Sequence, residues 1–411
     1  MTAVVDRHRA GGDVAIVGGT VVPAGGTRID GGTVLIGNGR ITAVGRAAVT
    51  PIPSGTAVVD ARGQWVLPGL VDAHTHLGID EEASGWAGDD LNETPEVNGA
   101  RLRAIDAINP ADIGFRDALA GGVTTVVVLP GSTSPIGGQA AALKCHGRTV
   151  DEMIVKHPIG VKSALGENPK RAHSNRGESP ATRLGIAAII RDAFGRAEAH
   201  RRRGGSDGAG QPDPTSEILV RVLDGEIPLL QHAHRADDIA TALRLADEFG
   251  YRLVVNHGTE AHLLADILAE RSVPVVCGPL LGTRTKLELA NRSLATPGIL
   301  ARAGVELALT TDHNEVPIDF LVHQATFAVK EGLPAAAALR ALTTNPARIL
   351  GIDDRVGALR PGLDGDVVIW SGNPLDVVSR VRQVFVDGRS VFAADPPAAA
   401  PAIDPAPRED D

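Results

Sequence analysis

The chain begins and ends with short apolar runs that glycine-rich turns interrupt. Residues 13–64 contain three such runs, and similar runs return near the carboxyl end. Alternating apolar and polar positions around turns such as Asn38-Gly39 predict β-hairpins. Neither end alone has enough strands to bury a face, so we expect 1–67 and 355–396 to pair as one discontinuous β-sandwich-like domain.

The middle of the chain, residues 68–354, has a different pattern, in which apolar strand candidates alternate with helix candidates. We expect eight strands, at 71–77, 123–129, 139–145, 159–165, 227–233, 252–258, 273–278 and 305–312. We expect helices at 111–121, 181–201, 236–249, 261–271, 285–303, 318–331 and 335–350. This alternation predicts βα units and a parallel sheet. A closed (β/α)₈ TIM barrel needs about 250 residues, which the segment supplies, so the predicted fold class is α/β.

Three further segments do not fit either pattern. Residues 202–215 are rich in Gly, Pro, Ser and Asp and predict a mobile loop. The Ala, Pro and acid-rich end predicts a disordered tail at 397–411. The long stretch at 80–110, which contains Trp86, is interpreted either as a lid over the site or as a rigid connection.

Composition excludes several classes of protein. The 411 residues are 43% hydrophobic and 22% charged, which is ordinary for a globular protein with a sizeable core. A net charge of −10 argues against a nucleic-acid partner. No run reaches the ~18 apolar residues that a membrane span requires, and the first residues lack the apolar core of a secretory signal. We interpret Cys145 and Cys277 as buried thiols, which fits a cytoplasmic protein. We expect the protein to form a homo-oligomer.

Polar residues that can bind metals or transfer protons end several of the predicted strands. They are His74, His76, Lys162, His232, His257 and Asp312. Because active sites of parallel barrels lie at the carboxyl ends of the strands, we expect these side chains to meet at one mouth of the barrel.

The histidines predict a metal site. Alternate residues of a strand face the same way, so His74 and His76 can reach one ion, and imidazole suits Zn²⁺ or another divalent first-row metal. His232 and His257 close neighbouring strands and are further ligand candidates. His234 has the same parity as His232 and competes with it, although His232 lies closer to the strand.

Two charged residues need a special environment at this mouth. Asp312 follows a strand too apolar for an uncompensated carboxylate, so we interpret it as a metal ligand or a proton-transfer group, with a helix N-cap as the alternative. An ammonium at Lys162 would be repelled by a metal ion, so this lysine must be neutral, modified or aimed elsewhere. Reaction with CO₂ would turn it into a carboxylate able to bridge two metals.

Taken in order, these motifs resemble the amidohydrolase superfamily, in particular its imidazolonepropionase-related and dipeptidase-like branches. The likeness spans nearly the whole chain and rests on LPGLVDAHTHLG, AGGVTTVVVLPG, GVKSALGENPKR, HAHRADDI, NHGTE, TTDH, TTNPARILGI and GLDGDVVIWSGNPLDV. It implies a (β/α)₈ barrel with a discontinuous β-sandwich, and hydrolysis of carbon–nitrogen bonds by metal-activated water.

The resemblance also implies roles for individual residues. The matching metal ligands are His74, His76, Lys162, His232, His257 and Asp312, for one or two Zn²⁺ ions, with Lys162 carboxylated in binuclear relatives. Asp312 matches the eighth-strand aspartate and would transfer the proton, and the metal, with a histidine such as His257 or His313, would polarise the substrate carbonyl.

Substrate recognition is expected in the loops that follow the strands. Glu167, Asn168, Lys170 and Arg171 follow the fourth strand and place cations and an acceptor near the mouth, where Arg suits a carboxylate. A salt-bridge network within the loop is the alternative. His234 and His313 complete the predicted substrate-binding set.

We therefore expect a metal-dependent amidohydrolase that cleaves a peptide-like or N-acyl amino acid substrate. Two alternatives remain within this class: opening of a small cyclic amide or amidine, and trimming of a modified natural-product peptide, as bottromycin-type amidohydrolases do. A catalytically inactive structural relative is the alternative from another class.

Overall fold

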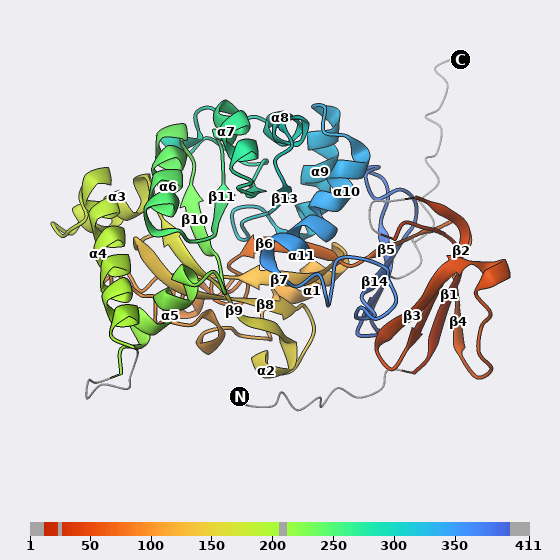
Figure 1. The fold of residues 1–411 in the computed structure, drawn as a ribbon. Helices are drawn as coiled ribbons and strands as arrows, with labels where there is room; N and C mark the ends of the chain where they lie inside the picture. Colours follow the sequence, from red (N-terminus) through yellow and green to blue (C-terminus); the bar gives the residue numbers. More distant parts are fainter. Residues whose placement is uncertain (1–11, 24–26, 205–211, 395–411) are drawn as a thin grey trace, which may run out of the picture.

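The computed structural model describes residues 12–23, 27–204 and 212–394, and it places them in two sheets with surrounding helices (Figure 1). The predicted tail and half of the predicted 202–215 loop lie outside these residues. The first of the two sheets has the strand order β13-β12-β11-β10-β9-β8-β7-β6. Its strands are β6 (Leu70–Thr75), β7 (Val123–Val128), β8 (Ile136–Lys144), β9 (Ile154–Ala164), β10 (Leu229–Ala233), β11 (Leu253–His257), β12 (Val275–Cys277) and β13 (Leu307–Leu309). All eight predicted strands are therefore present, and the fold is TIM-barrel-like.

The prediction of an all-parallel sheet is wrong at β8. This strand runs antiparallel to both β7 and β9, whereas the other neighbours in the sheet are parallel. The reason is the short connection at 129–135, which contains no helix and turns the chain directly back. Parallel neighbours need a longer crossover, so a turn of this length pairs the strands as a hairpin.

Asp72 closes the seam of the barrel between its first and last strands. Its carboxylate accepts hydrogen bonds from Thr310 Oγ1 at 2.6 Å, from the Thr311 backbone N–H at 3.0 Å and from Thr311 Oγ1 at 2.6 Å. The backbone N–H of His76 donates to the His313 carbonyl at 2.8 Å across the same seam. These bonds hold the end of β6 against the segment that follows β13.

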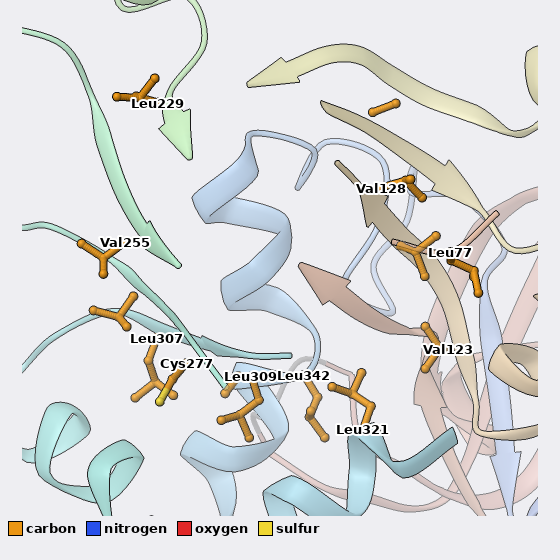
Figure 2. Close-up of a cluster of buried hydrophobic side chains, with 14 of the residues drawn as sticks. Leu77, Val123, Val128, Leu229, Val255, Cys277, Leu307, Leu309, Leu321 and Leu342 are labelled. Carbon is orange, nitrogen blue, oxygen red and sulfur yellow. The ribbon is translucent and has the colours of Figure 1, made fainter. Parts of the chain in front are cut away.

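Aliphatic side chains fill both faces of this sheet. Figure 2 shows side chains of one buried cluster, which includes residues of β7, β10, β11, β12 and β13 together with Leu321 of α9 and Leu342. A second cluster joins the opposite faces of the strands to α11 (Thr344–Leu350); its members include Val71, Val127, Ala140, Leu230, Val254, Val276, Ala308 and Leu350. The barrel is thus a packed core, and polar residues accumulate at one end of it.

Most helices lie where the sequence predicts them. These are α1 (Ile113–Ala120), α4 (Arg183–Arg202), α6 (Ala236–Phe249), α7 (Ala265–Glu270), α8 (Thr296–Ala303), α9 (Leu321–Lys330), α10 (Ala335–Ala341) and α11. The predicted helix at 285–303 is correct only for its second half, because Pro297 fits the first turn of a helix and α8 starts there; a 3₁₀ turn at Leu287–Leu289 precedes it. None of the described helices is both long enough and apolar enough to cross a bilayer.

Three helices were not predicted. They are α2 (Val150–Met153), α3 (Glu167–Ser174) and α5 (Pro214–Leu223). The α5 helix starts within the predicted loop because the Asp213 carboxylate caps it by accepting from the Ser216 backbone N–H at 3.0 Å. The α3 helix lies in the segment that follows β9 and therefore borders the mouth of the barrel.

The second sheet combines strands from both ends of the chain, as predicted. Its order is β16-β15-β14-β5-β1-β2-β3, with β4 paired to β1. The strands are β1 (Val14–Val21), β2 (Ile29–Gly37), β3 (Arg40–Arg46), β4 (Ala57–Asp60), β5 (Trp65–Pro68), β14 (Val367–Trp370), β15 (Val381–Val386) and β16 (Arg389–Ala393). Figure 1 shows β1–β4 in red beside β14 in blue. The sandwich-like description and the domain boundaries remain predictions.

A buried ion-pair network connects the two sheets. Lys144, at the end of β8, places Nζ 3.0 Å from Asp364 Oδ2 and also pairs with Asp366 and Asp387. The Arg355 guanidinium pairs with Asp364 at 2.7 Å. The three carboxylates outweigh the burial of the Lys144 ammonium and raise its pKa above the usual value. The charge of Lys144 is therefore retained at the junction between the sheets.

Candidate metal and active site

A cavity of about 810 Å³ opens at the carboxyl ends of the barrel strands. Among its lining residues are His76, Lys162, His232, His234, His257 and Asp312. Its volume falls within the usual range for small-molecule sites. Ligand-capable side chains from β6, β9, β10, β11 and the end of β13 thus share one cavity.

Asp312 is the point on which three histidines converge. Its Oδ1 lies 3.3 Å from His74 Nε2 and 3.4 Å from His76 Nε2, and its Oδ2 lies 3.7 Å from His257 Nδ1. Asp312 and His257 both have positive φ angles, 53° and 70°, which are uncommon for residues other than glycine. Such backbone outliers cluster at functional sites, where the surrounding structure maintains them.

A second histidine cluster adjoins the first. His232, His234 and His257 each offer a ring nitrogen, and these atoms lie within 4.8 Å of one another. His74, His257 and Asp312 form the other group of the same kind, so His257 belongs to both. The structure therefore brings together His232 and His234, which the sequence had placed in competition.

Hydrogen bonds on the far side of the rings orient two of these histidines. His76 Nδ1 lies 2.8 Å from the Leu129 carbonyl oxygen, and His257 Nδ1 lies 3.0 Å from the Gly278 carbonyl oxygen. A carbonyl can only accept, so Nδ1 is the donor in each ring and Nε2 carries the lone pair. This is how proteins commonly fix the tautomer of a metal-binding histidine.

Burial keeps the histidines neutral. It lowers the pKa values of His74, His232 and His234 well below the usual value, and that of His257 to about 3, with neighbouring positive groups contributing. Burial alone would raise the pKa of Asp312, but His257, His74 and His76 outweigh it and hold that pKa well below its usual range. The site thus presents neutral imidazoles beside a carboxylate, which is the donor set that a divalent metal requires.

Several of these nitrogens have no partner among the described residues. Both ring nitrogens of His232, Nδ1 of His74 and Nε2 of His257 are buried without a hydrogen bond. A buried polar atom without a partner carries a free-energy cost of about 1–3 kcal/mol, which coordination of a cation would remove. The residues present therefore fit a metal.

Lys162 lies beside this centre on β9. It is 1% exposed, and its Nζ lies 3.4 Å from His74 Nε2. Burial lowers the pKa of Lys162 to about 7, although Asp312 opposes that shift. A substantial fraction of this amine is therefore unprotonated near neutral pH.

The predicted substrate-binding residues lie in different places. Asn168 and Arg171 line the cavity, whereas Glu167 and Lys170 line a neighbouring pocket of about 340 Å³ that Arg171 also borders. His313 is buried outside the lining of the cavity, with Nε2 3.4 Å from Glu82 Oε1. The segment that the sequence presents as a loop is the helix α3, which carries Asn168 and Arg171 on the cavity wall.

Glu288 and Lys286 were not predicted and lie close to the histidines. Glu288 is 1% exposed, and its Oε1 lies 2.8 Å from Lys286 Nζ, 3.6 Å from His234 Nε2 and 3.9 Å from His232 Nε2. Burial raises the pKa of Glu288, but His234 and Lys286 outweigh it and lower the net value. Both residues lie in the segment after β12, which the sequence presents as the start of a surface helix, so no local motif marks them.

The 80–110 segment forms part of the cavity wall. Leu91 and Asn92 line the cavity, and Asn92 Oδ1 accepts hydrogen bonds from the backbone N–H and the hydroxyl of Thr133. Trp86, by contrast, is 92% exposed. The segment is thus tied to the loop that follows β7 through Asn92.

Comparison with known proteins identifies the family. The chain is 41% identical to a solved amidohydrolase from Thermotoga maritima, with a TM-score of 0.89 over 93% of this chain and 100% of that one. The chain belongs to the amidohydrolase superfamily. The amidohydrolase family profile also matches residues 219–391. Family membership makes this chain a hydrolase that acts on carbon–nitrogen bonds.

Curated relatives of this amidohydrolase are more distant. It is 29% identical over 400 residues to the amidohydrolase tasK of Hapsidospora irregularis, covering 87% of this chain but only 40% of that protein's length. It is 26% identical over 389 residues to an imidazolonepropionase of Methylobacterium sp. strain 4-46, covering 84% of this chain and 88% of the relative. These relatives agree on the superfamily and carry different names within it.

Proposed function

We propose that this amidohydrolase cleaves an amide bond of a peptide-like or N-acyl amino acid substrate with the help of one or two bound zinc ions. The observation that carries the proposal is the convergence of His74, His76 and His257 on Asp312, which lines the cavity. A carboxylate that several imidazoles approach in this way supplies the nitrogen and oxygen donors that suit a divalent ion.

The metal would be held by the predicted ligands. These are His74, His76, His232, His257, Asp312 and a carboxylated Lys162, with His234 adjacent to His232. A bound zinc ion would supply Lewis-acid activation of water and of the substrate carbonyl. Other divalent first-row ions suit the same nitrogen and oxygen donors.

Asp312 is the proposed proton carrier. Its low pKa keeps it ionised at neutral pH, so Asp312 can accept a proton from the attacking water. The same carboxyl group can then deliver that proton to the departing nitrogen. His257 is proposed to act on the carbonyl through the metal, because its Nδ1 donates to Gly278 and its Nε2, which carries the lone pair and has no other partner in the described part of the chain, would bind the ion.

Lys162 is proposed to be carboxylated. Formation of a carbamate requires attack of the neutral amine on CO₂, and burial already favours the neutral amine at Lys162. The modified side chain would replace a cation by an anion next to His74 and would remove the repulsion between the ammonium and a bound metal.

The substrate is proposed to present a carboxylate to Arg171. This guanidinium lines the cavity and suits a carboxylate geometrically. The likeness to an imidazolonepropionase favours a second candidate, the opening of a small cyclic amide. The two candidates differ in the bond that is cleaved and share the same metal centre.

Metal content and a substrate panel test the proposal together. Purified protein is stripped with a chelator, reconstituted with zinc and assayed with dipeptides, N-acyl amino acids and cyclic amides, while bound metal is counted by mass spectrometry. We expect about two zinc ions per chain and hydrolysis of the linear amides. A folded protein that binds no transition metal would refute the proposal, and turnover of cyclic amides alone would favour the second candidate.

A further inference from the structure

The charges that line the cavity are segregated into two groups. Asp80 and Glu315 lie in the segments after β6 and β13, and Asn314 Nδ2 donates to the Asp80 carbonyl at 2.9 Å, which joins these two segments. Arg171 lies on α3, after β9, and Lys286 is attached to the same helix because its Nζ donates to Asn168 Oδ1 at 3.0 Å. One acidic group and one cationic group thus border a single cavity.

The strand order places these groups on opposite sides. The barrel closes between β6 and β13, and β9 and β10 lie halfway round the sheet from that seam. The acids therefore stand at the seam and Arg171 stands across the mouth from it; the segment of Lys286 follows β12, but its ammonium is bonded to the helix that carries Arg171. The histidines and Asp312 lie at the strand ends of the same cavity.

The outermost charges have no partner within the protein. Neither the Arg171 guanidinium nor the Glu315 carboxylate forms a hydrogen bond or ion pair with any residue in the described ranges, although both line the cavity. Elsewhere on this chain, cations next to the mouth are neutralised: Arg183 pairs with Asp238 at 2.9 Å, and Arg235 pairs with Asp237 at 2.9 Å. Arg171 and Glu315 thus remain available to a ligand.

Lys286 is a fixed cation on the same wall as Arg171. Its side chain is 15% exposed, and Glu288 and Asn168 take two of the three hydrogens of its ammonium. The charge of Lys286 reaches the centre of the site, because it contributes to lowering the pKa values of Lys162, His232 and His234. A further arginine that lines the cavity, Arg292, already donates to the carbonyl oxygens of Gly282 and Thr283.

We propose that the cavity selects a zwitterionic dipeptide, with its free amino group facing Asp80 and Glu315 and its free carboxylate facing Arg171 and Lys286. This inference rests on the proposed amide hydrolysis and narrows its substrate class. Opposite charges at both ends of the substrate fix its orientation, so the amide bond between them lies over the histidines and Asp312. An N-acyl amino acid can pair only with the cationic group, and a neutral cyclic amide can pair with neither charged group.

Three matched probes test the acidic group and the cationic group of the cavity separately. L-Ala-L-Ala carries both charges, N-acetyl-L-Ala-L-Ala lacks the ammonium, and L-Ala-L-Ala amide lacks the carboxylate. Hydrolysis of the Ala–Ala bond is followed by release of the carboxyl-terminal product from zinc-loaded protein. We expect kcat/KM for the dipeptide to exceed that of each capped probe by at least about tenfold, since a charged hydrogen bond is lost with each cap.

Two variants, one in the cationic group and one in the acidic group, are expected to slow hydrolysis of different probes. Arg171→Gln should lower kcat/KM about tenfold for the dipeptide and the N-acetyl probe but leave the amide probe unchanged. Glu315→Gln should lower it for the dipeptide and the amide probe but leave the N-acetyl probe unchanged. Lys330→Gln and Glu331→Gln, which remove equal charges at the exposed end of α9, are the controls and should alter none of the three.

The outcomes distinguish this inference from the proposed function. Equal rates for the three probes, or equal losses in all three with either variant, would overturn the dipeptide inference. Turnover confined to N-acyl amino acids or cyclic amides would also overturn it and would leave the amide hydrolase intact. If zinc-loaded protein hydrolyses no amide, titration calorimetry with the same probes decides, and a dipeptide that binds no tighter than both capped probes overturns the inference.

Discussion

Asp72 accepts two hydrogen bonds from Thr311, one from the backbone N–H at 3.0 Å and one from the hydroxyl at 2.6 Å. The Asp72 carboxylate is 0% exposed. Its other oxygen accepts from Thr310 at 2.6 Å and from the backbone N–H of His74 at 3.2 Å. Asp72 therefore positions both His74 and the segment that carries Asp312.

Thr311→Ala should lower the free energy of unfolding by about 1–3 kcal/mol, because it leaves a buried carboxylate with one donor fewer. Asp72→Asn should lower it further, since an amide nitrogen cannot accept these bonds. Urea denaturation followed by circular dichroism measures both. Thr42→Ala, which removes a part-buried hydroxyl bonded to the Leu35 carbonyl, is the control and should cost about 1 kcal/mol or less. Equal losses at Thr42 and Thr311 would contradict the special role of the seam.

Lys144→Met should destabilise the protein by roughly 3–5 kcal/mol, because the buried Asp366 would lose its counter-charge, while Asp364 would keep only Arg355. The measurement is the midpoint and slope of urea unfolding. Lys330→Met, at the exposed end of α9, is expected to change stability little. A Lys144 variant as stable as the Lys330 variant would show that the network contributes nothing at the junction.

Lys162 should make stability depend on pH in a defined direction. Its folded pKa, about 7, lies below the unfolded value of 10.5, so the unfolded chain binds more protons between these two values. The stability of the wild type relative to Lys162→Met should therefore rise by several kcal/mol as the pH increases from about 7 to 10. Unfolding is measured in metal-free and CO₂-free buffer; a flat difference over this range would mean that Lys162 is charged when folded.

Carboxylation of Lys162 should be visible directly. Zinc-loaded protein supplied with ¹³C-bicarbonate should show a carbamate resonance that is absent from Lys162→Met. Electron density beyond the lysine amine in a zinc-loaded crystal would be equivalent evidence. A single metal ion with an unmodified lysine would reject the bridging carbamate.

Asp312→Asn should leave zinc binding largely intact and lower turnover by roughly a hundred- to ten-thousandfold, the usual contribution of a general acid–base group. The measurements are kcat and the metal count of the same preparation. Asp266→Asn, an exposed change on α7, serves as the control. Unchanged turnover in the Asp312 variant would remove this residue as the proton carrier.

Metal removal should destabilise the fold, because an ion that binds only the folded state contributes about 2.7 kcal/mol at a hundred times its Kd. Adding a chelator should thus lower the melting temperature of the wild type. The same addition should have a smaller effect on His232→Ala and the full effect on His146→Ala, whose exposed histidine lies outside the cavity. A chelator that shifts none of the three would contradict a metal at the His232 cluster.

The sequence predicts the strands and the polar residues at their ends well. It predicts the direction and the connections of the strands less well. The eight strands could be found because each is a compact apolar run, and the polar residues that end them were natural candidates. The direction of β8 could not be found, because an apolar run such as 139–145 has the same composition in either direction. Its reversal depends on the short turn at 129–135.

The missed residues belong to segments whose local pattern points elsewhere. Pro169 made 167–174 look like a loop, yet proline is tolerated in the first turn of a helix, where its missing N–H has no intrahelical partner. Glu288 lies in a charged stretch that resembles a solvent-exposed helix. Only the tertiary fold brings it against His234 and the backbone of Glu167.

The pairing of β5 with β14 also constrains how the molecule is assembled. Trp65 lies opposite Trp370, so the two strands belong to one sheet although the entire barrel separates them in the chain. During synthesis, the edge of β5 has no partner until residues 367–370 leave the ribosome. Exposed strand edges invite pairing with other chains, and contacts this distant in sequence form slowly. Completion of the second sheet is therefore expected to be a late step of biogenesis and the one most open to aggregation.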